Sequence, residues 1–327
     1  MEKSDSPAQN LYRPFVCGVG SYGVIFALDR ILAVKVCRET RDFCEREFAR
    51  EQKAYALLRN RSRYFLPLIH VVPLRAIFLP RVYNDLRAVL TLHNYAFAQD
   101  RADRWMGQIC GGLAFLESQG YAHADMRPDN IMVDDNDNIR IIDLGSMSSI
   151  GQRLLVGTEP FARQLTPEEA ESEKLGKYTQ YGLAGARSET FALGSVWYSI
   201  LRGHYPTPEL CKKQDINALQ ATYRERRFPP LAADSTASAV SADPPEMAND
   251  HIVYKCWNNL YASVAELEQV FRDRKDGTEW YRFPGETDDW IAARRQECIR
   301  WVESNGLETL KHPWTEKSQE TKKKSKK

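Results

Sequence analysis

Two short stretches decide the fold: HADMRPDN at residues 123–130 and IIDLG at residues 141–145. The chain between them has the pattern of a short strand, a polar turn at residues 134–137 and a second short strand. A turn, a short strand, a second turn and a second short strand form a layout that is typical of a catalytic loop followed by a metal-binding loop.

Phosphoryl transfer is one reaction that such loops could serve, and it requires that the phosphates are wrapped by the backbone, that Mg²⁺ is held and that an acceptor hydroxyl is oriented. A candidate for the first task lies upstream. Residues 18–23 read GVGSYG, a GxGxxG pattern in which Gly18, Gly20 and Gly23 allow backbone N–H groups to approach phosphate oxygens. Ser21 lies inside the same motif. On its own the pattern indicates only a glycine-rich hairpin, because it is common by chance.

Lys35 lies in the apolar run AVKV, where an ammonium group is costly to hold without an anionic partner. Glu51, on the helix predicted for residues 41–59, is the expected partner, because Tyr55 one turn later lies on the side expected to face the core. Glu45 and Glu47 on the same helix are alternatives, and all three glutamates could instead form a solvated charged face.

Periodicity divides the rest of the chain into elements. Alternating apolar residues and glycines predict β-ribbons over residues 12–36, with a tight turn at Asp29-Arg30. Helices are predicted over residues 100–119, 190–202, 251–257, 264–271 and 287–305, the last capped by Thr287 and docked on the domain through one apolar face. The composition of residues 230–250 predicts a flexible insertion. The lysine-rich composition of residues 311–327 predicts a disordered tail without packed structure.

Residues 123–130 and 141–145 resemble the HRDxKPxN catalytic loop and the DFG magnesium loop of the protein kinase family. The resemblance extends from about Tyr12 to Leu267. It implies a bilobal α+β fold, with a small antiparallel β-sheet lobe that carries one helix, a mainly helical larger lobe, and ATP with Mg²⁺ in the cleft between them. The implied segments are a flexible N-terminus at 1–11, the N-lobe at 12–79, a hinge at 80–84, the C-lobe at 85–271 and a helical extension at 272–310.

The resemblance also implies roles for single residues. Asp125 receives or orients the proton of the acceptor hydroxyl, while Asn130 and Asp143 bind Mg²⁺. Lys35 contacts the α- and β-phosphates of ATP. Arg127 stands where the family usually carries a lysine that helps to neutralise the γ-phosphate, and arginine is not equivalent to that point charge.

Further matches concern the nucleotide and the acceptor. Thr158, in the segment GTEP, resembles the substrate-loop threonine of serine/threonine kinases, which implies a protein substrate with a serine or threonine hydroxyl. Ile25, Ala33 and Met132 stand where the family holds the adenine ring, although all three could equally be plain core. The resemblance thus assigns nucleotide binding to Gly18, Gly20, Ser21, Gly23, Ile25, Ala33, Lys35, Glu51 and Met132.

The sequence departs from the family at several positions. Ala124 replaces an arginine that clamps phosphorylated activation loops, so we expect constitutive competence or regulation by a partner. Gln164 replaces the glutamate of a buried family ion pair whose arginine is also missing, which predicts a repacked site rather than a lone buried charge. Glu189 replaces an aspartate that braces the catalytic loop, with the same charge on a longer side chain.

Two other functions are open. One is a pseudokinase, which would use the fold as a nucleotide-binding scaffold without transferring phosphate. The departures at the bracing positions support this alternative. Against it, the sequence retains Lys35, Asp125, Asn130 and Asp143. A small-molecule kinase of the aminoglycoside or choline type has a similar arrangement of motifs. The glycine after Asp143 and the segments GTEP and Cys256-Trp257 favour the protein kinase branch.

Composition limits the partners and the compartment. The 45 basic and 44 acidic side chains leave a net charge of +1, which argues against a nucleic acid or an anionic membrane as a general partner. Seven cysteines without a CxxC motif predict neither a disulfide framework nor a zinc site. No apolar stretch has the length of a signal peptide or a membrane span, so we expect a cytoplasmic or nuclear protein. The lysine-rich tail could contact an acidic partner.

Overall fold

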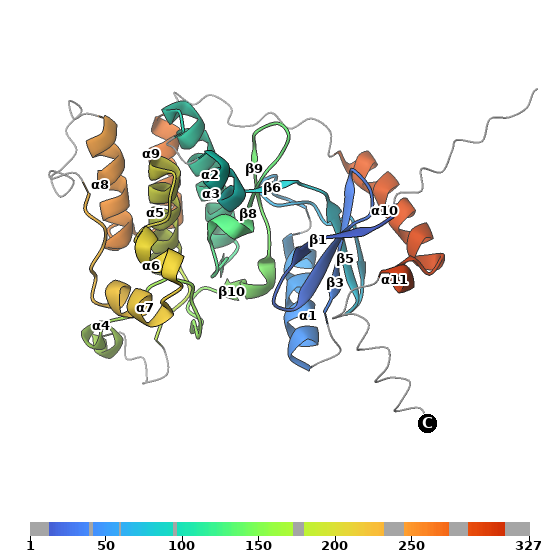
Figure 1. Cartoon of the computed structure of the whole chain (residues 1–327), viewed down its shortest axis with the longest axis horizontal. Helices are drawn as coiled ribbons and strands as arrows, with labels where there is room; N and C mark the ends of the chain where they lie inside the picture. Colours follow the sequence, from blue (N-terminus) through green and yellow to red (C-terminus); the bar gives the residue numbers. More distant parts are fainter. Residues whose placement is uncertain are drawn as a thin grey trace, which may run out of the picture. The chain divides into compact units, whose positions relative to one another are not determined.

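The structure is a computed structural model that describes residues 13–38, 42–58, 60–93, 97–172, 180–231, 245–274 and 287–310. It forms two compact units, whose elements are labelled in Figure 1. The first unit takes its residues from Met1–Arg59, Pro67–Arg81 and Gly285–Lys327, and the second from Asn60–Leu66 and Val82–Pro284. The first unit is therefore built from three separate segments of the chain.

The first unit contains a five-stranded antiparallel sheet with the strand order β1-β2-β3-β5-β4. The strands are β1 (Phe15–Val19), β2 (Gly23–Ala27), β3 (Leu32–Cys37), β4 (His70–Val72) and β5 (Ala76–Pro80). The side chain of Asp29 closes the turn between β2 and β3, because its Oδ1 accepts hydrogen bonds from the N–H groups of Ile31 at 2.6 Å and Leu32 at 2.7 Å. This contact confirms the tight turn predicted at Asp29-Arg30.

Helices cover both faces of this sheet (Figure 1). Lys35 of β3 reaches α1 (Asp42–Leu58), whereas its neighbour Val34 belongs to a core shared with α10 (Asp288–Glu303) and α11 (Gly306–Thr309), because successive side chains of a strand point to opposite faces. The core on the side of α10 and α11 contains Val24, Phe26, Leu32, Val34, Ile69, Ala76, Phe78, Cys298, Leu307 and Leu310, with Trp290, Trp301 and Val302 packed against it.

The C-terminal helix α10 begins and docks as the sequence predicts. The side chain of Thr287 caps it by accepting a hydrogen bond from the N–H of Trp290 at 3.2 Å. Trp301 packs edge-on against Phe78 of β5, with ring centroids 5.9 Å apart. Cys298 is buried in the same core. Residues far along the chain thereby complete the core of the N-terminal sheet.

The second unit is mainly helical, and together the two units confirm the expected α+β class. α3 packs against α9, and α5 packs against α8. Its helices are α2 (Leu86–His93), α3 (Gln99–Ser118), α4 (Pro167–Ser172), α5 (Ala186–Arg202), α6 (Pro208–Lys213), α7 (Ile216–Arg224), α8 (Pro245–Trp257) and α9 (Val264–Asp273). Its strands are β6 (Asn84–Asp85), β7 (Tyr121–Ala122), β8 (Ile131–Val133), β9 (Ile139–Ile141) and β10 (Ser148–Ser149). No helix among these described residues is long and apolar enough to cross a membrane.

The prediction of a flexible insertion over residues 230–250 is wrong at its C-terminal end, because α8 begins at Pro245. The polar residues there are buried and paired. The Asn249 amide donates to Gln99 Oε1 at 2.8 Å, and the Asp250 carboxylate accepts two hydrogen bonds from Arg202 at 2.7 and 2.9 Å. The composition of this segment is typical of a loop, but these long-range partners stabilise it as a helix.

Three other predictions concern residues outside the described part of the chain: the middle of that insertion at residues 232–244, the N-terminus at residues 1–11 and the tail at residues 311–327. They stay predictions, as do the hinge and the lobe boundaries.

Candidate active site

Lys35 and Glu51 form a buried ion pair in the first unit. Lys35 Nζ lies 2.7 Å from Glu51 Oε2, and the two side chains are only 10% and 1% exposed. Glu47, one of the alternatives, instead pairs with the exposed Arg50 at 3.1 Å. The predicted pairing of Lys35 with Glu51 is therefore confirmed, and removal of one charge of such a buried pair is strongly destabilising.

Two glycines of residues 18–23, Gly18 and Gly23, lie close against side chains of the sheet. A Cβ on Gly23 would lie 2.9 Å from Lys35 Cε, and a Cβ on Gly18 would lie 3.2 Å from Ile25 Cδ1. The N–H of Gly20 donates to the carbonyl of Gly23 at 2.8 Å and closes the loop between β1 and β2. Larger residues at Gly18 and Gly23 would displace the side chains beneath this loop.

Tyr22 is a contact of Lys35 that sequence reasoning missed. Lys35 Nζ lies 4.5 Å from the centroid of the Tyr22 ring and 3.5 Å from its hydroxyl oxygen. The sequence does hold a signal for this contact, because Tyr22 is an aromatic residue inside the glycine motif and the strand that follows it pairs with the strand of Lys35. Of the other nucleotide-binding candidates in the first unit, Ser21 is exposed and Ala33 is buried.

The catalytic-loop candidates lie in the second unit, where Asn130 is bonded to Asp125. Asn130 Nδ2 donates to the backbone oxygen of Asp125 at 2.8 Å and to its Oδ2 at 3.0 Å. The amide oxygen of Asn130 therefore points elsewhere, and it accepts no hydrogen bond from the described residues. Amide and carboxylate oxygens are ligands of Mg²⁺, so this orientation fits the metal-binding role predicted for Asn130.

Asp143 lies close to this pair at the end of the hairpin of β8 and β9. The N–H of Ile142 donates to the backbone oxygen of Asn130 at 3.0 Å, and the His123 Nε2 atom lies 3.0 Å from the carbonyl oxygen of Ile142. Asp143 itself has a left-handed backbone with φ of 60°. These contacts bring the two stretches that decide the fold into one site. Met132 of β8, two residues after Asn130, is half-buried.

Glu189, at the N-terminal end of α5, fixes the strained start of the catalytic loop. Ala124 has φ of 65°, a conformation that is unfavourable for a residue with a Cβ. The buried Glu189 carboxylate accepts hydrogen bonds from the N–H of His123 at 2.9 Å and of Ala124 at 3.1 Å. Burial raises the pKa of Glu189, while these two bonds and His123 act in the opposite direction. The longer side chain thus reaches the loop backbone directly.

Asp125 lies among charges of both signs. Burial raises its pKa, the neighbouring Asp143 acts in the same direction, and Arg127, His123 and the hydrogen bond from Asn130 oppose the rise. Arg127 Nε lies 3.7 Å from Asp125 Oδ2. This Nε is buried and has no hydrogen-bond partner among the described residues. A buried N–H donor beside the carboxylate fits an anionic ligand such as a phosphate group.

A cavity of about 30 Å³ opens beside Asp125 within the second unit. Its lining includes the predicted substrate-loop residue Thr158, which is exposed, and the apolar residues Val156 and Phe161. Val156 is 78% exposed, and its neighbour Leu155 is 70% exposed, so two adjacent apolar side chains face solvent here. The structure thus places Asp125 and Thr158 at one pocket, with apolar surface next to them.

Arg163 and Glu169 replace the ion pair that the sequence shows to be missing. The buried Arg163 donates to both carboxylate oxygens of Glu169, at 2.7 and 2.8 Å. Thr166 caps α4 and exchanges hydrogen bonds with Glu169, at 2.8 and 3.2 Å. Sequence reasoning missed this pair, although the pattern TPEE at residues 166–169 is a helix-start signal that could have located Glu169.

Comparison with known proteins agrees with this geometry. The chain is similar to serine/threonine-protein kinase 16 of Rattus norvegicus, with 26% identity over 243 residues, which cover 68% of this chain and 77% of the relative. It is also similar to serine/threonine-protein kinase chk1 of Schizosaccharomyces pombe, with 31% identity over 118 residues, which cover 34% of this chain and 21% of the relative. The family model described as "Protein kinase domain" matches residues 16–258, most of the chain. The chain therefore belongs to the protein kinase family.

Proposed function

We propose that this protein is an active kinase that transfers the γ-phosphate of ATP to a serine or threonine hydroxyl of a protein substrate. The observation that carries this proposal is the environment of Asp125. Asp125 lines a pocket with Thr158, its carboxylate is held by the Asn130 amide, and it lies beside a buried Arg127 donor that has no hydrogen-bond partner within the described part of the chain. A proton acceptor, a metal-ligand candidate and an anion-binding group therefore meet at one place.

Each residue has a defined task in this reaction. Asp125 orients the acceptor hydroxyl and takes its proton as the new O–P bond forms and the bond to the ADP leaving group breaks. Asn130 and Asp143 would hold Mg²⁺, which neutralises charge on the phosphates. Lys35, kept in place by Glu51, would bind phosphate oxygens of ATP, and Arg127 would neutralise charge on the transferred group.

The acceptor class rests on Thr158 and on the relatives. Relatives from several organisms carry the name serine/threonine-protein kinase. Thr158 is exposed at the pocket that Asp125 lines, where an acceptor side chain would approach. We therefore expect serine and threonine, rather than tyrosine, as acceptors.

The test compares phosphate incorporation by the wild-type protein and the Asp125→Asn variant with ATP and Mg²⁺. The acceptors are the protein itself, a generic basic protein and a library of peptides with serine, threonine or tyrosine. Asp135→Asn is the matched control, since Asp135 is an exposed aspartate of the same unit. We expect the wild type and the control to label serine or threonine, and Asp125→Asn to lose about 10²- to 10⁴-fold in rate.

Other outcomes favour the alternatives. A wild-type protein that incorporates no phosphate, while ATP still raises its melting temperature, would be a nucleotide-binding pseudokinase. Transfer to an aminoglycoside or to choline, with no labelled protein, would identify a small-molecule kinase. Equal rates of phosphate transfer for the wild type and Asp125→Asn would show that Asp125 has no role in the reaction.

A further inference from the structure

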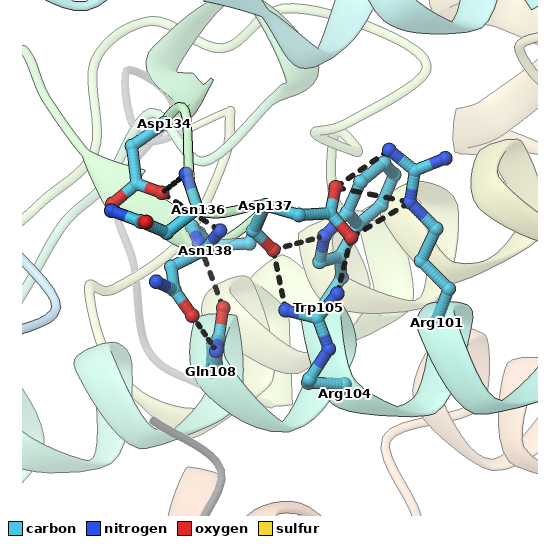
Figure 2. Close-up of polar contacts among 9 residues, drawn as sticks. Arg101, Arg104, Trp105, Gln108, Asp134, Asn136, Asp137 and Asn138 are labelled. Carbon is cyan, nitrogen blue, oxygen red and sulfur yellow. Dashed lines mark hydrogen bonds and ion pairs between the residues drawn. The ribbon is translucent and has the colours of Figure 1, made fainter. Parts of the chain in front are cut away.

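Asp137, in the turn between β8 and β9, is held by three side chains of α3 (Figure 2). Arg101 donates to Asp137 Oδ1 through Nη2 at 2.6 Å, and its Nε lies 3.0 Å from both carboxylate oxygens. Arg104 donates to the Asp137 carboxylate and backbone oxygen, and Trp105 Nε1 donates to the same backbone oxygen at 3.0 Å. We call Arg101, Arg104, Trp105 and Asp137 the hairpin clamp.

The clamp stabilises an unfavourable backbone conformation. Asp137 has φ of 61°, in the left-handed region where a non-glycine residue is strained. Two guanidinium groups face its single carboxylate, so the cluster has a net charge of +1, and loss of that carboxylate leaves two like charges side by side. The contacts of α3 therefore determine how the tip of the hairpin is placed, beyond what the turn sequence alone would do.

A second set of bonds extends the contact along the hairpin (Figure 2). Gln108 of α3 donates to Asn138 Oδ1 at 3.2 Å and accepts from the N–H of Ile139 at 2.7 Å. Gln108 and Asn138 are both buried. Asp134 Oδ1 accepts from the N–H groups of Asn136 at 2.9 Å and Asn138 at 3.0 Å. The closed end of the hairpin is thus tied to α3 through Asp137, Asn138 and Ile139, while Asp134 closes the turn itself.

The open end of the same hairpin carries both predicted ligands of Mg²⁺. β8 follows Asn130 directly, and Ile142 and Asp143 follow β9. Three register pairs join the strands, among them Ile131 with Ile141, and the Ile142 N–H bond to Asn130 closes the open end. A rigid two-stranded ladder therefore connects the clamp to Asn130 and Asp143.

We propose that Asp137 is a positioning residue for Mg²⁺, which acts through the hairpin of β8 and β9 to fix the relative placement of Asn130 and Asp143. The inference rests on the metal-binding role that the proposed function gives to these two residues. Groups that orient metal ligands, without touching the metal, commonly change metal affinity by about 10- to 100-fold when they are removed.

The test measures how strongly Mg²⁺ increases ATP binding, using the dissociation constant of a fluorescent ATP analogue with and without Mg²⁺. The variant is Asp137→Asn, because asparagine also tolerates the left-handed conformation and differs mainly in charge. We expect the Mg²⁺-dependent gain in affinity to fall about tenfold, while the metal-free dissociation constant stays as in the wild type. Asp135→Asn, two residues away in the same turn, should retain the full gain.

A double variant separates the clamp from general damage. Arg101→Gln combined with Asp137→Asn should be no worse than Asp137→Asn alone, because both changes remove the same contact. A lower melting temperature of Asp137→Asn with an unchanged Mg²⁺-dependent gain would make the clamp purely structural and overturn the proposal. A wild-type protein that binds Mg²⁺-ATP without phosphate transfer contradicts only the proposed function, whereas one without any Mg²⁺-dependent binding contradicts both.

Discussion

At the scale of single residues, Asp125 lies between opposing influences on its charge. Burial and the nearby Asp143 favour the protonated form, whereas Arg127, His123 and Asn130 favour the carboxylate. The balance leaves the pKa of Asp125 above the ordinary aspartate value of 3.8. As the proposed base, Asp125 binds a proton more readily than an exposed aspartate does.

This balance predicts the pH dependence of the reaction. In the proposed reaction only the deprotonated Asp125 accepts the hydroxyl proton, so kcat/KM should fall as the pH is lowered through the raised pKa, with a midpoint above 3.8. Replacing Arg127 with glutamine removes a charge that lowers this pKa, so the midpoint should move to higher pH in the Arg127→Gln variant. Rate profiles of both proteins would show this, and an unmoved midpoint would contradict the assignment.

Glu51 offers a second prediction at this scale. Glu51→Gln removes the carboxylate charge that lies 2.7 Å from the ammonium group of the buried Lys35, so we expect a loss of about 3 kcal/mol in the free energy of unfolding. Misplacement of the lysine should also lower the rate of phosphate transfer about 100-fold. Chemical denaturation and steady-state kinetics measure the two effects.

The control for Glu51 is Glu47→Gln on the same helix. Glu47 pairs with an arginine that is 51% exposed, and exposed ion pairs contribute about 0–1 kcal/mol. Equal effects of the two substitutions on rate and stability would show that the Lys35–Glu51 pair has no special role.

Prediction from sequence succeeded best where a residue's partner follows from local periodicity. Glu51 could be chosen over Glu47 because helical spacing places it on the face of Tyr55, and the structure confirms that pair. Tyr22 and the hairpin clamp could not be derived in this way. Their contacts depend on how strands and helices are packed against one another, which no local pattern specifies.

At the scale of elements, the segment from Phe161 to Ser172 shows how a lost ion pair can be replaced. The sequence shows a glutamine, Gln164, at the position where the family has a glutamate. Which residue takes over the role of that glutamate depends on the path of the chain after Gln164. Because Thr166 starts α4, Glu169 turns back onto the buried Arg163. Arg163 lines the pocket beside Asp125, so its ion pair with Glu169 connects this pocket to the short helix α4.

The Glu169→Ala variant tests this pair. It leaves Arg163 buried and unpaired, which should reduce the free energy of unfolding at pH 7 by about 3 kcal/mol. Despite burial, which acts in the opposite direction, the bonds from Arg163 and Thr166 hold the pKa of Glu169 below its ordinary value of 4.5. The stabilisation is therefore present above pH 4.5 and is lost as the pH falls through the lowered pKa.

Denaturant titrations across this pH range would measure the difference between wild type and Glu169→Ala, which should shrink toward low pH. Glu171→Ala is the control, since Glu171 is an exposed glutamate of the same helix. A difference that does not depend on pH would mean that Glu169 acts through packing rather than charge.

At the scale of the whole molecule, the family match and the folded units do not coincide. The match ends at residue 258, yet α10 and α11 lie beyond it and belong to the first unit. Cys298, Leu307 and Leu310 are buried against β-strands that precede them by most of the chain. These helices are part of the core of the sheet that carries Lys35, rather than an appendage.

Trp301→Ala tests this role of α10. Large-to-small changes at core tryptophans cost about 3–5 kcal/mol, and we expect the lower end because Trp301 keeps part of its surface in water. Thermal unfolding should then show an earlier transition for the first unit, while the second unit melts as in the wild type. Arg300→Ala, an exposed change on the same helix, should leave the melting curve unaltered.

The placement of α10 and α11 also determines the order of events during synthesis. A ribosome releases β1 to β5 early, but the helices that cover one face of their sheet emerge only after the entire second unit has been translated. Until then Val34 and Phe78 have no cover from α10 and α11, and a nascent sheet with bare apolar surface is a target for chaperones and for aggregation. The second unit, whose sequence is interrupted only once, can fold first, so the N-terminal sheet would be the last part of this kinase to mature.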